Sequence, residues 1–177
     1  MDLHPFRLIN PGVGGVKLKI NNKDLSLIAI FAALYTVLVI IFAPISFYTL
    51  QFRLAGVIRP AIAKKWTLTI GYALGVIIGN FFSPFAGIYE LLFMPIMSFI
   101  AGTLGYLLAK KFNNNYFITG AVIATIIPIS VSWMLNQLFT IPIVATLPYL
   151  FISEQIICFV GSFIFKIIDM RFKWWDK

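Results

Sequence analysis

The chain runs from Leu25 to Ala43 without a charged side chain and is then broken by Pro44. A helix needs roughly 20 predominantly apolar residues to cross the hydrocarbon core of a bilayer. This run meets that length, and comparable runs follow it. Because 60% of the 177 residues are hydrophobic and 11% are charged, we predict an all-α integral membrane protein. There is room for roughly five to seven spans and no separate soluble domain.

Apolar runs and polar breaks predict six transmembrane helices. They cover residues 25–43, 51–63, 66–82, 86–109, 116–135 and 145–168, within a membrane domain of residues 24–170. Residues 1–23 are interpreted as a cytoplasmic N-terminal extension and residues 171–177 as a cytoplasmic tail. The beginning does not resemble a signal peptide, because a full-length span follows it without a plausible cleavage site. A five-span alternative, with 51–63 as a re-entrant loop, would put the basic connections on inconsistent sides.

Basic residues gather in alternate connections of this topology. They precede the first segment or follow segments two, four and six: Lys17, Lys19, Lys23, Lys64, Lys65, Lys110, Lys111, Arg171, Lys173 and Lys177. The positive-inside rule therefore predicts a multi-pass plasma-membrane protein with both termini in the cytoplasm. Membrane orientation also explains the net charge of +8 better than nucleic-acid binding, which gathers basic residues on one polar face.

Arg53 and Arg59 lie inside the short second segment, which would measure about 20 Å as a helix against a hydrocarbon core of roughly 30 Å. Charged side chains at membrane depth are costly unless they are paired or line a cavity, so they indicate function. Glu90 and Glu154 are the acidic residues within the membrane segments. We expect Arg53, Glu90 and Glu154 to converge on a hydrated cavity in the outer half. For Arg59, ligand contact and a structural role by pairing or snorkelling both remain open.

Neutral polar and aromatic side chains at a similar depth complete the predicted substrate-binding site. They are Gln51, Asn80, Asn136, Gln137 and Trp133. Carboxylates, amides, an arginine and aromatic walls suit a flat heterocycle with donors and acceptors on its edge, such as a guanine-like base. The same groups would suit other small polar vitamins, and individual aromatic residues can instead form an interfacial belt or pack in the core.

Motifs for catalysis are missing from the sequence. The single histidine, His4, precedes the first segment, and Cys158 is the one cysteine. Histidine metal sites, Ser-His or Cys-His nucleophiles and disulfide frameworks therefore lack the residues they need. No GxxxxGK[ST] motif occurs, so the chain cannot hydrolyse ATP by the P-loop route. We predict no enzymatic activity, no metal and no cofactor.

Small residues recur four positions apart on two predicted helices. Ala29 and Ala33 lie on the first, and Gly71, Gly75 and Gly79 lie on the third. This spacing lets helix backbones approach closely. For the glycines we favour packing within the chain, whereas for the alanines contact with a partner protein is an equally good interpretation.

Two stretches carry a family resemblance: IAIFAALYTVLVIIFAPISF followed by LQFR, and GNFFSPFAGIYELLF. Over roughly residues 28 to 165, the chain resembles the QueT family of queuosine-precursor transporters. The resemblance implies a six-helix S component of an energy-coupling factor (ECF) transporter, which captures a 7-deazaguanine precursor outside. A transmembrane T component and two ATPase subunits would drive it. It also implies that Ala29, Ala32 and Ala33 meet the T component, and that the pocket includes Gln51, Arg53, Asn80, Glu90 and Glu154.

The chain departs from the family pattern after QFR. Leu54–Val57 (LAGV) replaces a Ser-Glu-Ala-Leu-like stretch, Arg59 follows, and Glu90 stands where Asp is more familiar. The loss of one acidic residue and the gain of Arg59 make the predicted site less negative. This difference affects the expected identity of the ligand more than the expected class of transporter. The alternative function is a self-sufficient secondary transporter or channel in which Glu90 and Glu154 relay protons. No inverted repeat between the two halves supports it.

Overall fold

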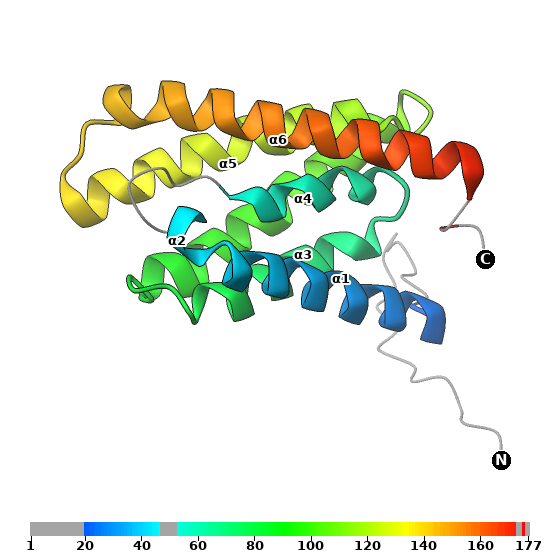
Figure 1. Cartoon of the computed structure of the whole chain (residues 1–177), viewed down its shortest axis with the longest axis horizontal. Helices are drawn as coiled ribbons and strands as arrows, with labels where there is room; N and C mark the ends of the chain where they lie inside the picture. Colours follow the sequence, from blue (N-terminus) through cyan, green and yellow to red (C-terminus); the bar gives the residue numbers. More distant parts are fainter. Residues whose placement is uncertain (1–19, 47–52, 173–174, 176–177) are drawn as a thin grey trace, which may run out of the picture.

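The computed structural model describes residues 20–46, 53–172 and 175, and the described residues form a helical bundle (Figure 1). The elements are α1 (Asn22–Ile41), α2 (Ala43–Ser46), η1 (Leu54–Ala63), α3 (Thr67–Asn80), η2 (Tyr89–Phe93), α4 (Met94–Lys110), α5 (Tyr116–Phe139) and α6 (Ile143–Arg171). η1 is a 3-10 helix. η2 is a π-helical turn that continues directly into α4. The all-helical prediction is confirmed.

Four helices in the described part of the chain are long and apolar enough to cross a membrane. They are α1, the continuous η2–α4 helix, α5 and α6. η1 has 10 residues and α3 has 14. At rises of about 2.0 Å and 1.5 Å per residue, each measures roughly 20 Å, which is less than a hydrocarbon core of about 30 Å. Multiple candidate spans are therefore established, while crossing by η1 and α3 stays a prediction.

The ends of several helices differ from the predicted boundaries. α5 extends to Phe139, and its C-cap Thr140 has a left-handed backbone with φ of 57°. Pro142 then precedes α6, which extends to Arg171. α5 ends later than the predicted residue 135 and α6 starts earlier than the predicted residue 145, because the chain reverses only at Thr140 to Pro142. The end of α6 also lies beyond the predicted residue 168. The predicted start of the second segment, at residue 51, lies outside the described residues.

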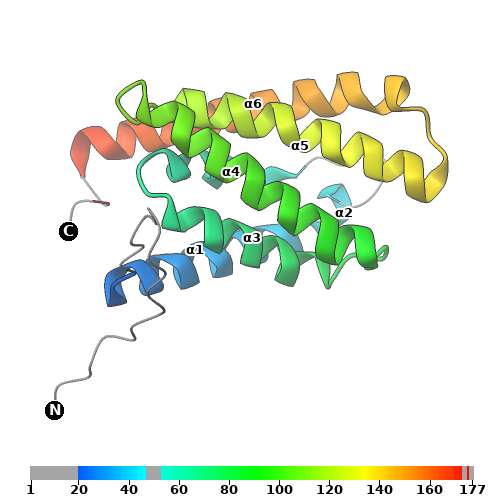
Figure 2. The same ribbon diagram turned by 180° about the vertical axis from the view of Figure 1, so that it is seen from behind.

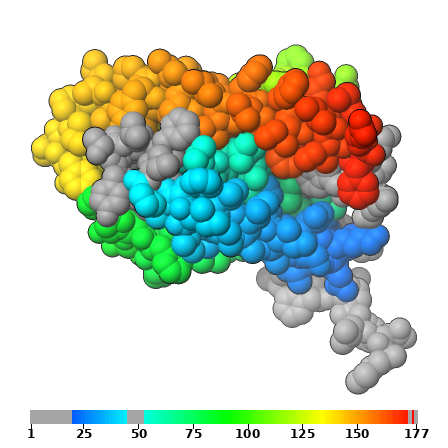
Figure 3. Space-filling view, in the orientation of Figure 1, coloured from blue at the N-terminus to red at the C-terminus, as the bar shows by residue number. Residues whose placement is uncertain are grey.

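η1 occupies the centre of the bundle. It contacts α1, α3, α4, α5 and α6, and eight of its ten residues are buried. Figures 1 and 2 place it between α1 and α6 on one side and α4 and α5 on the other. In the space-filling view, part of η1 is visible between α1 and α6 (Figure 3). The neighbouring helices therefore shield most of this short, charged segment from lipid.

Glycines allow the close helix contacts that hold this arrangement. A Cβ added at Gly71 would lie 2.7 Å from the Ile28 carbonyl oxygen of α1, and one added at Gly75 would lie 2.9 Å from the Tyr35 Cβ. One added at Gly161 of α6 would lie 2.0 Å from the Val57 carbonyl oxygen of η1. The interpretation of the α3 glycines as packing within the chain is confirmed.

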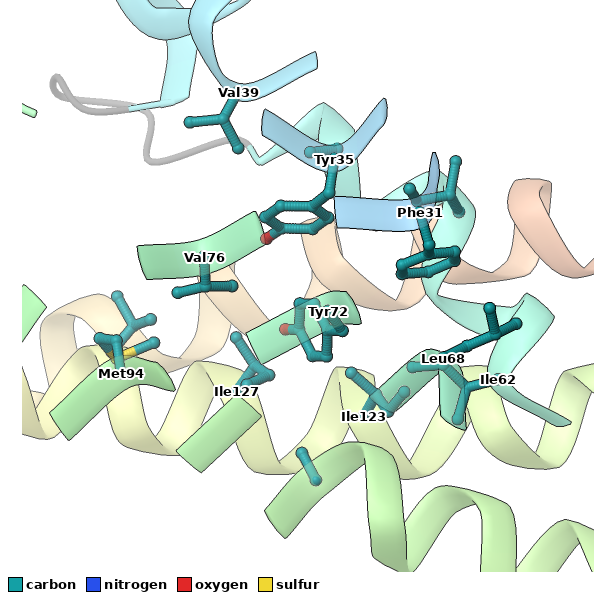
Figure 4. Packing of buried hydrophobic residues seen from close by; sticks show 14 of the residues in the cluster. Phe31, Tyr35, Val39, Ile62, Leu68, Tyr72, Val76, Met94, Ile123 and Ile127 are labelled. Carbon is teal, nitrogen blue, oxygen red and sulfur yellow. The ribbon is translucent and has the colours of Figure 1, made fainter. Parts of the chain in front are cut away.

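The core around η1 includes two buried tyrosines. Tyr35 of α1 and Tyr72 of α3 meet edge to face, with ring centroids 5.1 Å apart. Figure 4 shows both side chains in the apolar packing, with Ile123 and Ile127 of α5 nearby. Two buried phenol groups bring polar atoms into the interior, and buried polar atoms need hydrogen-bond partners.

The basic connections lie at one end of the bundle. The start of α1, the η1–α3 and α4–α5 connections and the end of α6 gather there in Figure 1. Lys64 Nζ lies 3.2 Å from Asp169 Oδ2, and Lys65 Nζ lies 2.6 Å from Asp24 Oδ1. These pairs tie the η1–α3 connection to α6 and α1. The helix directions agree with the alternation that the sequence predicts, while the side of the membrane that this end faces stays a prediction.

Candidate functional site

Arg59, in the middle of η1, is completely buried and has several polar contacts. Its Nη1 group is paired with Glu154 Oε2 of α6. Its Nη2 group donates a hydrogen bond of 3.1 Å to the Tyr35 hydroxyl. The guanidinium carbon also lies 5.3 Å from the centroid of the Tyr72 ring, within the range of a cation–π interaction. Of the roles left open for Arg59, the structure shows pairing, since a side chain with 0% exposure does not reach the interface by snorkelling.

Arg53, just before η1, forms a looser pair with Glu90 of the η2 turn. Arg53 Nη2 and Glu90 Oε1 are 4.0 Å apart, which is too long for a hydrogen bond. The two residues are 3% and 1% exposed. Glu90 Oε2 is also buried and accepts no hydrogen bond from the described residues. A buried carboxylate oxygen without a donor is costly, so this edge of Glu90 has unused capacity to accept hydrogen bonds.

The backbone at Glu90 is held by Asn80, the last residue of α3. Asn80 Nδ2 donates a hydrogen bond of 2.8 Å to the Glu90 carbonyl oxygen. Asn80 is buried, with 1% exposure. The structure therefore places Asn80 beside Glu90, in contact with its main chain.

Aromatic side chains surround the same turn. The Trp133 ring of α5 lies 5.9 Å from the Tyr89 ring and 4.8 Å from the Phe93 ring, between centroids. Trp133 remains 39% exposed. Trp133 thus contacts the two aromatic residues at the ends of the turn that carries Glu90.

Three other predicted site residues lie elsewhere or are not described. Asn136 Nδ2 donates a hydrogen bond of 3.0 Å to the Ile141 carbonyl oxygen, which fixes the α5–α6 connection. Gln137 is exposed, with Nε2 at 3.4 Å from Asn136 Oδ1. Gln51 lies outside the described residues.

The ionisable residues form two ion pairs where the sequence suggested one convergent group of three. Glu154 contacts Arg59, whereas Arg53 is near Glu90. Sequence reasoning also missed Tyr35 and Tyr72 as neighbours of Arg59. The available signal was weak, since it consisted only of phenol groups within apolar runs, whose hydroxyls need partners when buried. Among the described residues, no group of three or more His, Cys, Asp or Glu is arranged to hold a metal ion.

Several membrane-length helices around buried ion pairs define a multi-pass membrane protein with an internal polar site, a combination typical of transport pathways. The family model described as QueT transporter matches residues 25–170, so the chain belongs to the QueT transporter family. It is therefore a membrane transporter for a small molecule and not an enzyme. Searches of curated proteins and of solved structures found no match.

Proposed function

We propose that this protein is the substrate-binding S component of an ECF transporter that imports a queuosine precursor of the 7-deazaguanine type. The observation that carries this proposal is the family match over residues 25–170. The sequence contains no P-loop motif, so energy from ATP would have to come from separate ATPase subunits. A T component would connect these subunits to the chain.

Glu90 is the proposed centre of the substrate site. A guanine-like edge presents adjacent N–H donors, which one carboxylate can accept together. Glu90 Oε2 is buried and receives no hydrogen bond from the described residues, which supports this role. Arg53, 4.0 Å from the same carboxylate, would donate to a ligand carbonyl together with Gln51. Trp133 would provide a stacking surface beside the turn.

The remaining predicted residues take different parts in this proposal. Glu154 would act by neutralising Arg59, with which it is paired. Asn136 and Gln137 lie at the end of α5, opposite the basic connections (Figure 1), where they would line the entrance. If the basic end faces the cytoplasm, as the positive-inside rule favours, this entrance is outside. A protease should then digest tags on the two termini in inside-out vesicles. Digestion of the tags on intact cells would show that the termini face outside, which contradicts the predicted orientation.

An exposed face of α1 is the proposed docking surface for the T component. Ala29 and Ala33 are exposed, while the opposite face of α1 packs against the glycines of α3. Ala32 is 6% exposed and its carbonyl oxygen faces Gly75, so the proposed surface consists of Ala29 and Ala33. Small side chains would let a partner helix approach closely.

The docking proposal predicts that Ala29→Trp with Ala33→Trp abolishes co-purification of the T component. Affinity for substrate should be unchanged, because these side chains point away from the bundle. Leu34→Trp is the matched control, since Leu34 is an exposed residue of the same helix on a different face. An intact complex with the double substitution would contradict the docking surface.

Transport experiments separate the proposed function from its alternative. Calorimetry on purified protein should show binding of 7-deazaguanine, and uptake into proteoliposomes should require the T component, the ATPases and ATP. If no heat of binding is measured with deazapurines, purines or B-type vitamins, the proposed ligand class is wrong. Uptake driven by a proton gradient without ATPases would establish a self-sufficient secondary transporter instead.

A further inference from the structure

The turn that presents Glu90 leaves a main-chain acceptor without its usual donor. In the π-helical turn Tyr89–Phe93, the Met94 N–H donates to the Tyr89 carbonyl oxygen, five residues back. The same register would pair the Glu90 carbonyl oxygen with the N–H of residue 95. Residue 95 is Pro95, and proline has no N–H to donate. The helix itself therefore cannot supply this bond in the π register.

Asn80 supplies the missing donor from another helix. Its Nδ2 atom lies 2.8 Å from the Glu90 carbonyl oxygen, and the side chain is buried at the end of α3. Buried main-chain carbonyls that lose their partner are destabilising. Asn80 and Pro95 are thus complementary: proline removes the internal donor, and the amide replaces it from α3.

The register of this turn also determines which way Glu90 points. If the turn became α-helical, the Met94 N–H would donate to Glu90, four residues back, in place of Tyr89. A change of one residue in register rotates the preceding side chains by about 100° around the helix axis. The π register is therefore what directs the Glu90 carboxylate towards Arg53, and π-helical turns often occur at functional sites.

We propose that Asn80 is a positioning residue that holds the π-helical turn in the register that presents Glu90 to the substrate. This inference rests on the proposed function, because it takes Glu90 as the substrate acceptor. It replaces direct substrate contact, the role expected for Asn80 from the sequence, with action through the Glu90 main chain. Pro95 takes part by keeping an internal donor away from the same carbonyl.

A double-substitution cycle distinguishes positioning from direct contact. In calorimetric titrations with 7-deazaguanine, Asn80→Leu should weaken affinity by about tenfold or more, the loss expected for one buried hydrogen bond. In a Pro95→Ala background, the restored N–H can donate to the Glu90 carbonyl, so Asn80→Leu should cost less than about threefold. Equal losses in both backgrounds would show direct contact and overturn the inference. The absence of any loss would also overturn it.

Thr119→Val is the matched control for this cycle. Thr119 Oγ1 is a buried donor to a main-chain carbonyl, that of Gly105, at 3.2 Å, but it lies on another helix pair. Its substitution should leave the affinity for 7-deazaguanine unchanged in both backgrounds. A loss as large as that of Asn80→Leu would show that any buried side-chain to main-chain bond matters equally, which would contradict a specific role for Asn80.

A second measurement does not depend on substrate binding. The sequence contains two glutamates, Glu90 and Glu154, so labelling glutamate at its main-chain carbonyl carbon gives two NMR signals. The Glu90 signal, identified by its loss in Glu90→Gln, should shift in Asn80→Leu and return towards its original position when Pro95→Ala is added. If the signal behaves in this way but 7-deazaguanine does not bind, the proposed function fails and the positioning role stands. A signal that does not move refutes the positioning role.

Discussion

The two buried arginine–glutamate pairs use the same residue types but have different surroundings. Arg59 is in contact with Glu154, donates to the Tyr35 hydroxyl and lies beside the Tyr72 ring. Arg53 and Glu90 are 4.0 Å apart, and Glu90 Oε2 accepts no hydrogen bond from the described residues. Both pairs are buried, but the Arg59 guanidinium is closely paired, whereas the Glu90 carboxylate keeps an acceptor that is not used.

This difference shows that a buried charge in a membrane segment does not by itself identify a substrate site. A pair with close, direct contacts already offsets much of its desolvation and stabilises one packing of the helices. A carboxylate that retains an unused acceptor can gain hydrogen bonds when a ligand brings donors. We propose on this basis that the Arg59 pair stabilises the fold and that the Arg53 pair recognises the substrate, and the following substitutions test that division.

The largest effect is expected from Arg59→Met, which leaves Glu154 buried without its cation. Breaking a buried pair by removing one partner typically costs about 3–5 kcal/mol. The unfolding midpoint in detergent should fall sharply or the protein should fail to accumulate. Adding Glu154→Leu should recover much of this loss, because an apolar pair can replace a buried ion pair at little cost. An unchanged midpoint for Arg59→Met alone would contradict the structural role.

Glu90→Gln should affect substrate affinity much more than stability. Hydrogen bonds to a charged group contribute about 1.5–3 kcal/mol, which corresponds to roughly tenfold to 150-fold in affinity. Arg53→Met is expected to weaken binding as well. Calorimetry with 7-deazaguanine and unfolding curves measure the two effects separately. The division between the pairs would be wrong if Glu90→Gln bound normally while the folded Arg59→Met, Glu154→Leu protein did not bind.

Gly161→Ala tests how both pairs depend on the position of η1. The new Cβ would lie 2.0 Å from the Val57 carbonyl oxygen, so η1 has to move. Val57 lies between Arg53 and Arg59 in the sequence, so both pairs would be displaced. Overpacking of this kind costs about 1–3 kcal/mol, and affinity should fall together with stability. Gly87→Ala is the control, because its Cβ would meet its nearest neighbour, the Phe85 carbonyl oxygen, at an ordinary 3.6 Å. Equal unfolding midpoints for Gly161→Ala and Gly87→Ala would contradict the tight contact between Gly161 and the Val57 carbonyl oxygen.

The smallest effect on stability is expected at the basic end of the bundle, whose residues belong to neither buried pair. Lys65→Met removes the contact with Asp24 at 2.6 Å, a partly exposed pair worth about 0.2–1 kcal/mol. The unfolding midpoint should fall slightly and less at high salt, while affinity for 7-deazaguanine stays the same. Lys110→Met, at an exposed lysine, is the control. A loss of affinity in Lys65→Met would link this end to recognition.

The helical segments and the grouping of basic connections could be predicted from the sequence. Both depend on local properties, namely the length of apolar runs and the residues between them. The glycine spacing of α3 likewise identified a face that packs within the chain. Boundaries were less exact at α5 and α6, because their ends depend on the backbone at Thr140 and Pro142.

The form of η1 and the pairing of Arg53 and Arg59 could not be predicted in the same way. Arg59 and Glu154 are 95 residues apart, so their contact depends on how η1 and α6 pack. The sequence placed Arg53, Glu90 and Glu154 at similar depths, but depth does not specify which helices are neighbours. The contact of Asn80 with Glu90 depends on the π register and on Pro95, which hydropathy does not reveal.

The central position of η1 has a consequence for the order of membrane insertion. Each arginine at the centre of an isolated helix opposes insertion by about 2.5–3.5 kcal/mol, so η1 is a poor candidate to enter lipid as it leaves the ribosome. The partner of Arg59 is made much later, on the last helix. We therefore expect η1 to remain at the translocon or the membrane surface until α6 has been synthesised. Ribosome-bound chains that stop before α6 should leave η1 accessible to water-soluble cysteine reagents.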